Sequence, residues 1–242
     1  SLGLVGSEMC IRDSRSTSRI DIGNLPDPLA TLPGSATGFS DATAVRNKVY
    51  FYVIAIAKGS DVLFTQNQEY GYFPDTGPGP TKLLRGSWTS GYFGTCSAAE
   101  LAQNSELATA MGINLNAVNT SQVQIWHKFI VDGKILFQPQ YTVGQTTWIN
   151  LYNNGLVYGT NDNGARPATG SVSTLNPVNQ MKTFTKDNRK YIVRLPKASA
   201  APTTELLGDF TAADARWADG EWNRTMGPVS YTHLRAHETE AD

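Results

Sequence analysis

Residues 48–57 read Lys-Val-Tyr-Phe-Tyr-Val-Ile-Ala-Ile-Ala and contain the longest apolar run in the sequence. β-branched and aromatic side chains fit the pleated surface of a strand, and apolar residues at both alternating sets of positions allow both faces to be buried. We therefore predict a strand here. Residues 58–61, Lys-Gly-Ser-Asp, read as a turn, and residues 62–65 read as the returning strand of a hairpin.

This hairpin resembles the last hairpin of a fibronectin type III module, whose penultimate strand carries a Tyr-x-Tyr-x-Val pattern. The match consists of Tyr50, Tyr52 and Ala55, with the valine displaced by one residue. An unspecified β-hairpin is the alternative, because such hairpins share much of the pattern. The resemblance implies a partial fibronectin III-like β-sandwich over residues 15–74.

The segments on either side are rich in Pro and Gly. Residues 15–40 predict irregular chain with one short strand. Residues 73–80 read Phe-Pro-Asp-Thr-Gly-Pro-Gly-Pro, and their prolines withhold the amide donors that a sheet needs. We place the domain boundary there, with a linker over residues 75–85. A phosphate-binding loop is not expected, because the Walker spacing is missing and proline removes the amides that would hold a phosphate.

The second region, residues 86–227, mixes short helices with strands. Residues 97–100 have the form of a capping box leading a short helix. A second helix over residues 105–111 should end at Gly112. Asp132-Gly133 separates two apolar runs and predicts a type I′ hairpin turn, because that turn needs positive φ at both central residues.

Weaker patterns predict the remaining elements of this region. They are a helix capped by Thr147 and closed by Gly155, a strand over residues 156–158, an Asn/Gly-rich loop over residues 160–170, a hairpin of residues 182–185 and 190–195, and a helix within residues 209–223. The fold class that follows is mainly β with short helices (α+β).

The two ends of the chain are related through the genetic code. Codons can be chosen for residues 4–14 whose complementary strand, read one frame over, encodes residues 228–238 letter for letter. That DNA resembles the end sequence used in transposase-based library preparation. We therefore predict that residues 1–14 and 228–242 are translated adapter that stays unpacked, and that the native chain is a truncated piece over about residues 15–227.

Composition excludes several classes of function. The formal net charge is −1 and becomes slightly positive without the two ends. The basic residues form no stripe that would indicate a nucleic-acid partner. No apolar run is long enough for a membrane span. Setting the two ends aside removes Cys10, His233 and His237. Cys96 is then the one remaining cysteine and His127 the one remaining histidine. This excludes an internal disulfide framework and a cysteine-ligated zinc site, and agrees with assembly in a reducing cytoplasm.

Candidate reactive residues are few. His127 lies beside Trp126 on an alternating strand face and is expected to be packed. Cys96 precedes a predicted helix, where its pKa could be lowered, and could pair only with His127. An acidic stretch could bind a cation or supply two carboxylates. Its arginines instead favour a solvated face of mixed charge. The stretch consists of Asp209, Asp214, Asp219 and Glu221 beside Arg216 and Arg224. We expect no catalytic residue, no metal and no cofactor. Ligand-binding residues cannot be assigned, because aromatics that stack on sugars are not distinguished from core ones.

From about residue 86 onward, an ordered series of short patterns resembles the carboxy-terminal domain of tailed-bacteriophage virion structural proteins of the tail-fibre or baseplate type. The matching stretches are residues 91–94, 97–101, 126–129, 132–137, 147–152, 155–159, 191–195 and 221–224. The resemblance implies a C-type-lectin-like fold. Arg194-Leu195-Pro196 and Glu221-Trp222 are also similar to formylglycine-generating enzymes of that fold. Those enzymes use paired cysteines, so Cys96 alone does not support their activity.

The resemblance implies a non-enzymatic phage tail or tail-fibre structural protein. We expect it in the virion, assembled in the bacterial cytoplasm with other virion proteins, as a homo-oligomer, with host surface glycan or receptor as its candidate ligand. A bacterial carbohydrate-binding or adhesion module is the alternative. A polysaccharide-degrading tailspike-type enzyme is a weaker one, because it needs a carboxylate pair in a groove.

Overall fold

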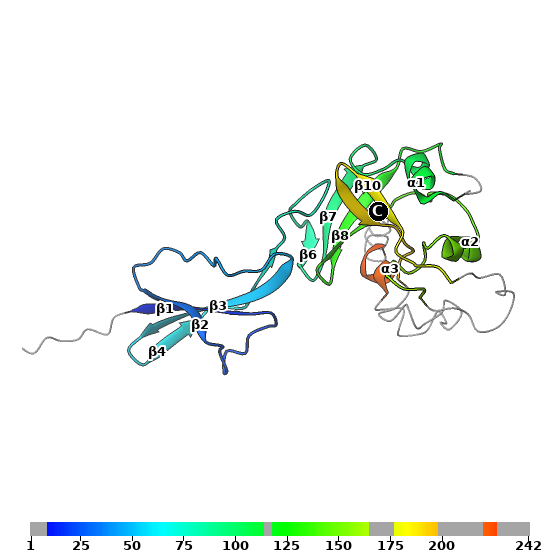
Figure 1. The fold of residues 1–242 in the computed structure, drawn as a ribbon. Helices are drawn as coiled ribbons and strands as arrows, with labels where there is room; N and C mark the ends of the chain where they lie inside the picture. Colours follow the sequence, from blue (N-terminus) through cyan, green and yellow to red (C-terminus); the bar gives the residue numbers. More distant parts are fainter. Residues whose placement is uncertain (1–8, 114–117, 165–176, 198–219, 227–242) are drawn as a thin grey trace, which may run out of the picture. The chain divides into compact units, whose positions relative to one another are not determined.

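The structure is a computed structural model that describes residues 9–113, 118–164, 177–197 and 220–226 (Figure 1). The chain is mainly β-sheet and divides into two compact units. Unit 1 extends to Thr76 and includes Ser87–Thr89, and unit 2 comprises Gly77–Gly86 and the chain from Ser90 onward.

Unit 1 is built on one antiparallel sheet with β3 at its centre (Figure 1). On one side of β3 lies β1, followed by β2; on the other side, β4 and β5 pair with different halves of β3. Its strands are β1 (Cys10–Ser16), β2 (Pro28–Pro33), β3 (Lys48–Lys58), β4 (Asp61–Phe64) and β5 (Gln68–Tyr72). The predicted strand, turn and returning strand over residues 48–65 therefore form as the β3–β4 hairpin. A sandwich needs two packed sheets, and the described strands of unit 1 form one.

The β1 strand corrects one expectation. Residues 1–14 were predicted to stay unpacked, but Cys10–Ser16 pairs with β2 on one side and β3 on the other, and Ser14 is buried. The ladder is made by backbone groups, so an extended segment without Pro or Gly can add to the free side of β3 whatever its origin. The adapter origin of the ends stays a prediction about the coding DNA. Residues 1–8 and 228–242 lie outside the described residues.

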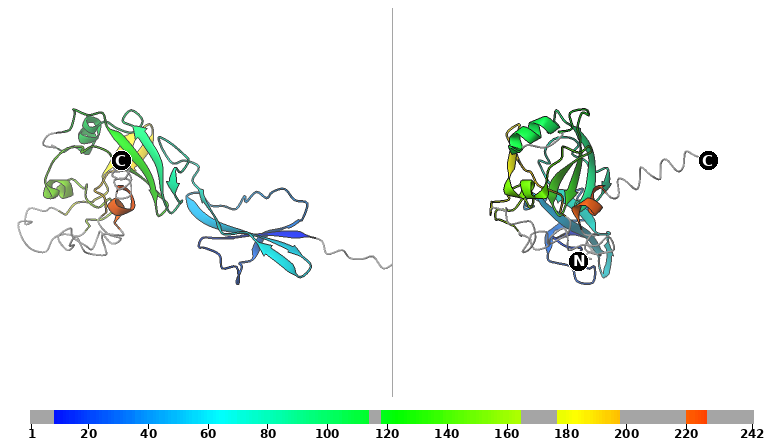
Figure 2. Two further views of the ribbon diagram at one scale, coloured as in Figure 1. Left: turned by 180° about the vertical axis from the view of Figure 1, so that it is seen from behind. Right: turned by 90° about the vertical axis from the view of Figure 1, so that its right-hand side faces the viewer.

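Unit 2 is built on a four-stranded antiparallel sheet in the order β6-β7-β8-β9, with a separate β10–β11 hairpin (Figure 2). Its strands are β6 (Arg85–Gly86), β7 (Ser90–Ser97), β8 (Ile125–Val131), β9 (Lys134–Pro139), β10 (Thr183–Lys186) and β11 (Arg189–Ile192). Its helices are α1 (Asn104–Met111), α2 (Trp148–Asn153) and α3 (Glu221–Arg224). The main core joins β7 and β8 to α1 through Cys96, Trp126, Leu107 and Met111.

Several local patterns in unit 2 fold as predicted. Asp132 and Gly133 have φ of 49° and 72°, as a type I′ turn requires. The α1 helix ends at Gly112, which has φ of 67°. Thr147 caps α2 by accepting a hydrogen bond from the Asn150 amide.

Other patterns fold differently. Ser97 and Glu100 form the reciprocal capping contacts, yet a turn follows and the helix begins only at Asn104. Residues 156–158 are buried but form no strand. The predicted connection between residues 185 and 190 is shorter than expected, because Lys186 and Arg189 pair as the last residues of β10 and β11. The turn is therefore Asp187 and Asn188, which both have positive φ.

The predicted linker is largely part of unit 2. Residues 77–86 belong to that unit, and Arg85–Gly86 forms β6. Lys128 on β8 is fully buried and donates hydrogen bonds to the carbonyls of Gly77 and Pro80, at 3.3 and 2.7 Å. Prolines withhold amide donors but leave carbonyl acceptors, so this segment can accept hydrogen bonds from a buried ammonium group.

Candidate functional site

The thiol and the imidazole that sequence suggested as a pair lie on opposite faces of the β7–β8 ladder. Cys96 is paired with Trp126 and Thr95 with His127. Directly paired residues share a face and successive residues alternate, so Cys96 faces the α1 side with Trp126 while His127 faces the other side. The two groups therefore do not form a nucleophile and its base.

Each of these two residues has its own surroundings. His127 is buried, and its Nδ1 lies 3.1 Å from the hydroxyl oxygen of Tyr92, with Phe129 also beside it. Burial, with a smaller contribution from the negative charge of Glu100, raises the pKa of the Cys96 thiol to about 11. The predicted packed histidine is thus confirmed, whereas the lowered thiol pKa is wrong because the thiol lies in the core.

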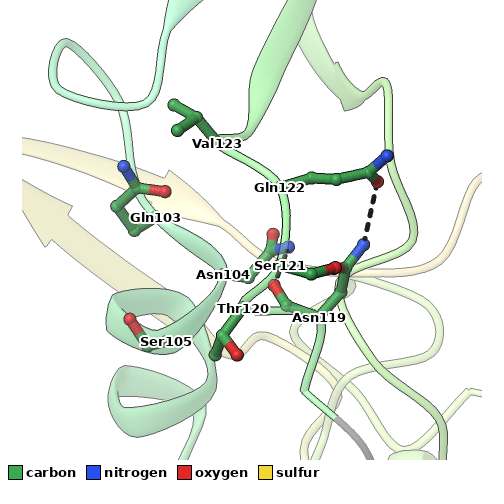
Figure 3. A pocket seen from close by; sticks show the side chains of 8 residues that line it. All are labelled: Gln103, Asn104, Ser105, Asn119, Thr120, Ser121, Gln122 and Val123. Carbon is green, nitrogen blue, oxygen red and sulfur yellow. Dashed lines mark hydrogen bonds between the residues drawn. The ribbon is translucent and has the colours of Figure 1, made fainter.

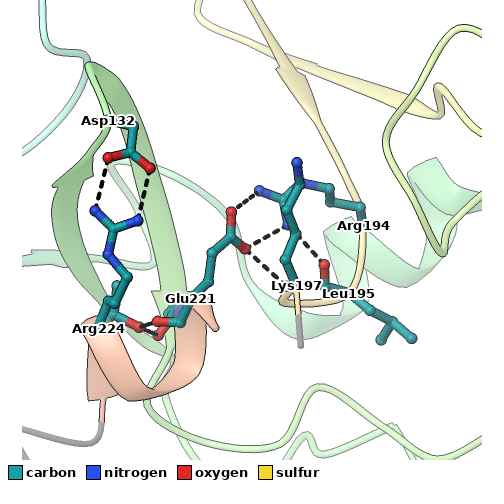
Figure 4. Close-up of polar contacts among 8 residues, drawn as sticks. Asp132, Arg194, Leu195, Lys197, Glu221 and Arg224 are labelled. Atoms are coloured by element: carbon teal, nitrogen blue, oxygen red, sulfur yellow. Dashed lines mark hydrogen bonds and ion pairs between the residues drawn. The ribbon is translucent and has the colours of Figure 1, made fainter. Parts of the chain in front are cut away.

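The acidic stretch also differs from expectation. Asp209, Asp214, Asp219 and Arg216 lie outside the described residues. Glu221 is part of a bidentate ion pair with Arg194, with nitrogen–oxygen distances of 2.6 and 2.5 Å, and it also accepts the Lys197 amide (Figure 4). Glu221 is only 12% exposed, so it is not on a solvated face.

A second bidentate pair joins α3 to the β8–β9 turn. Arg224 donates to both carboxylate oxygens of Asp132, at 2.7 and 2.8 Å (Figure 4). The hydrogen bond from Arg224 lowers the pKa of Asp132 below its ordinary value, against the opposing effect of burial. Thr225 adds a buried contact to Gln138 on β9. The charged residues around α3 therefore hold this helix against the rest of unit 2.

A cavity of about 260 Å³ opens beside the start of α1 (Figure 3). Two stretches line it, and none of their side chains is charged: Gln103, Asn104, Ser105, Asn119, Thr120, Ser121, Gln122 and Val123. Val123 is the apolar member and is 70% exposed. No periodic pattern marks this site in the sequence, because amide and hydroxyl residues at a helix start and in a separate loop resemble ordinary caps and turns.

Buried amides fix the walls of this cavity. Asn104 donates to the Asn119 carbonyl at 2.8 Å, and Gln124 donates to the Asn104 side-chain oxygen at 2.7 Å. Gln124 also donates to the Tyr141 carbonyl and accepts the Tyr141 amide. One buried glutamine thus joins the α1 start, the 119–124 loop and the chain after β9.

The exposed edge of the cavity is held by weaker contacts. The Asn119 amide donates to the side-chain oxygen of Gln122 at 3.3 Å, and the Ser121 hydroxyl donates to Asn119 at 2.9 Å (Figure 3). These three side chains are at least partly exposed, so their amide and hydroxyl groups can exchange these contacts for contacts with a ligand.

No family model matches this chain, and no curated protein or solved structure matches it. Within the described residues, no group of three or more His, Cys, Asp or Glu side chains could hold a metal ion, and no helix is long and apolar enough to cross a membrane. The cavity offers neutral donors and acceptors side by side, an arrangement that suits binding of a hydroxyl-rich ligand.

Proposed function

We propose that this protein is a non-enzymatic structural protein of a bacteriophage tail, of the tail-fibre or baseplate type, whose second unit contacts bacterial surface glycan. In this proposal unit 1, with its single described sheet, is part of a fibronectin III-like module that precedes a C-type-lectin-like domain, and the chain assembles with other virion proteins. The ordered series of sequence patterns from residue 86 onward supports the virion class. The uncharged cavity supports the glycan ligand.

The lining of the cavity carries the argument for a neutral saccharide. Sugar hydroxyls both donate and accept hydrogen bonds, and Asn and Gln side chains offer a donor and an acceptor in one planar group. Asn119 and Gln122 present such groups at the rim, and Val123 supplies an apolar contact for a ring face. The volume of about 260 Å³ lies just below the roughly 300 Å³ at which sites for drug-sized ligands begin, which suits one sugar residue.

The buried amides favour binding by preorganisation. Asn104 and Gln124 are almost completely buried and hold the two lining stretches together. A site whose backbone is already ordered loses less conformational entropy when a ligand binds. Two candidate reactive residues in the described part of unit 2 have structural contacts instead: Cys96 is packed in the core and Glu221 is paired with Arg194.

A panel of purified bacterial surface polysaccharides tests the site. The full chain should bind at least one neutral polysaccharide, and Asn119→Ala or Gln122→Ala should weaken that binding about tenfold, because a lost hydrogen-bond partner of about 1.4 kcal/mol corresponds to that factor. Lys190→Ala, at an exposed position on β11, is the matched control and should bind like the parent chain. If both cavity variants bind like the parent chain, the site is wrong.

The genes beside the coding sequence test the functional class. Capsid, tail-tube or baseplate genes on the untrimmed parent DNA would agree with the proposal. A secretion signal with a polysaccharide gene cluster would instead favour the bacterial adhesion module, which could use the same cavity.

A further inference from the structure

The two edges of the unit 1 sheet differ in how they are protected. The β2 edge begins and ends with proline, at Pro28 and Pro33, and proline blocks the addition of a further strand. The β4 edge, Asp61–Phe64, has no proline or lysine, and all four residues are exposed. Within the described residues, β4 pairs with β3 alone.

The apolar side chains of β4 are exposed on both faces of the sheet. Leu63 is 74% exposed and lies beside Ile56, which is 37% exposed, on one face. Val62 and Phe64 lie on the other face and are 44% and 40% exposed. An exposed edge strand with apolar side chains is a template for pairing with another strand.

The ladder fixes which backbone groups of β4 point outward. The two-residue turn makes Lys58 and Asp61 the closing hydrogen-bonded pair, so hydrogen bonding to β3 alternates from there. Ile56 and Leu63 form the next such pair, and the Thr65 amide donates to the Ile54 carbonyl at 2.9 Å. The amides and carbonyls of Val62 and Phe64 therefore face away from β3.

We propose that β4 pairs antiparallel with β4 of a second copy of this chain, about a two-fold axis at Leu63. Val62 of each copy then exchanges two backbone hydrogen bonds with Phe64 of the other. Leu63 faces Leu63 as a non-hydrogen-bonded pair, in which side chains approach most closely. The same surface patch serves both copies, as a two-fold interface requires.

Self-complementarity identifies a second copy as the occupant. Outward-facing residues must pair with outward-facing residues, so the register can shift only in steps of two. Shifting one way places Asp61 opposite Leu63, and shifting the other way places Leu63 opposite Thr65. In the proposed register Asp61 lies opposite Thr65, so no carboxylate faces another. The apolar row formed by Ile56 and Leu63 on one face of the sheet then continues into the second copy. This interface uses unit 1 alone and does not rest on the proposed function.

Sedimentation analysis of the full chain tests the interface. The parent chain should have twice its mass of 26.3 kDa. Leu63→Lys should be monomeric, because it places a charge on the axis. Val62→Pro should also be monomeric, since proline there removes an outward amide and leaves the β3 ladder intact. Leu84→Lys, at a site 67% exposed in unit 2, should stay dimeric.

A disulfide at the axis gives a second readout. In a Cys10→Ser background, Leu63→Cys should form a cross-linked dimer on oxidation, because Cα atoms about 4.5 Å apart allow a disulfide. Ser60→Cys in the turn should not. A monomeric parent chain at all concentrations, a trimer, or dimers that survive both Leu63→Lys and Val62→Pro would overturn the proposal. Binding of β4 only to a strand of a different protein would overturn it as well.

Discussion

Several charged and reactive residues in the described part of unit 2 hold the fold together. Cys96 packs in the core, Lys128 is buried under the 77–80 segment, and Glu221 pairs with Arg194. Sequence placed His127 correctly on a strand but placed Cys96 only in front of a helix, and it could not show that β7 and β8 pair in a register that puts the two residues on opposite faces. Lys128 was missed, although its position two residues from both Trp126 and Ile130 on one face was a signal for burial.

The thiol of Cys96 should react slowly in the folded chain. A pKa of about 11 leaves about one thiolate in a thousand at pH 8, and the thiolate is the nucleophile. Iodoacetamide at pH 8, followed by peptide mass spectrometry, should label Cys10 long before Cys96, and both should react alike in denaturant. Equal labelling rates in the folded chain would contradict the burial of this thiol.

The same thiol makes stability depend on alkaline pH. The pKa is raised from 9.0 in the unfolded reference to about 11 on folding, so the folded chain keeps a proton that the unfolded chain loses. The contribution of the thiol to stability is therefore full below about pH 9 and is lost as the pH rises towards 11. Cys96→Ala should remove this part of the pH dependence in urea unfolding experiments.

The Arg194–Glu221 pair should matter more than an exposed pair. Glu221→Gln leaves the guanidinium of Arg194, which is 15% exposed, without its charge partner. We expect a loss of about 1–3 kcal/mol in the free energy of unfolding. Lys186→Gln breaks the more exposed pair with Glu106 and should cost less than about 1 kcal/mol. Equal losses in urea titrations would show that burial does not set the strength of the first pair.

At the scale of elements, local patterns predicted turns well and element limits less well. Asp132-Gly133 was predictable because a type I′ turn depends on its own two residues. The capping box at Ser97 and Glu100 forms without a helix, because capping satisfies a few amides but does not supply the packed face that stabilises a short helix. The cavity was not predictable, because Gln124 joins it to the chain after β9 through contacts distant in sequence.

The two hairpin turns of unit 2 provide a matched pair of variants. Gly133→Ala places a Cβ at φ of 72° and should lower the free energy of unfolding by about 1–2 kcal/mol. Asn188→Gly removes the backbone strain of a non-glycine residue at φ of 60°. It should raise the free energy of unfolding by a few tenths of a kcal/mol. Urea unfolding of both variants gives the comparison. Opposite signs are expected, and a neutral Gly133→Ala would contradict the assigned turn.

At the scale of the whole molecule, the β-rich class and the division into two units near the Pro/Gly segment could be anticipated from composition. The position of the predicted linker within unit 2 could not be anticipated, because residues 77–80 are held there by hydrogen bonds from Lys128, which lies 48 residues beyond Pro80. The chain has two surfaces of different chemistry: an apolar strand edge in unit 1 and a neutral polar cavity in unit 2. Both suit association with other molecules.

The central claim is that this scaffold binds surface polysaccharide without cleaving it. One measurement tests it directly: the full chain is incubated with a polysaccharide that it retains, and bound protein and newly formed reducing ends are followed in the same sample. We predict saturable binding with no increase in reducing ends over time. Reducing ends that accumulate in proportion to the protein added would contradict the account.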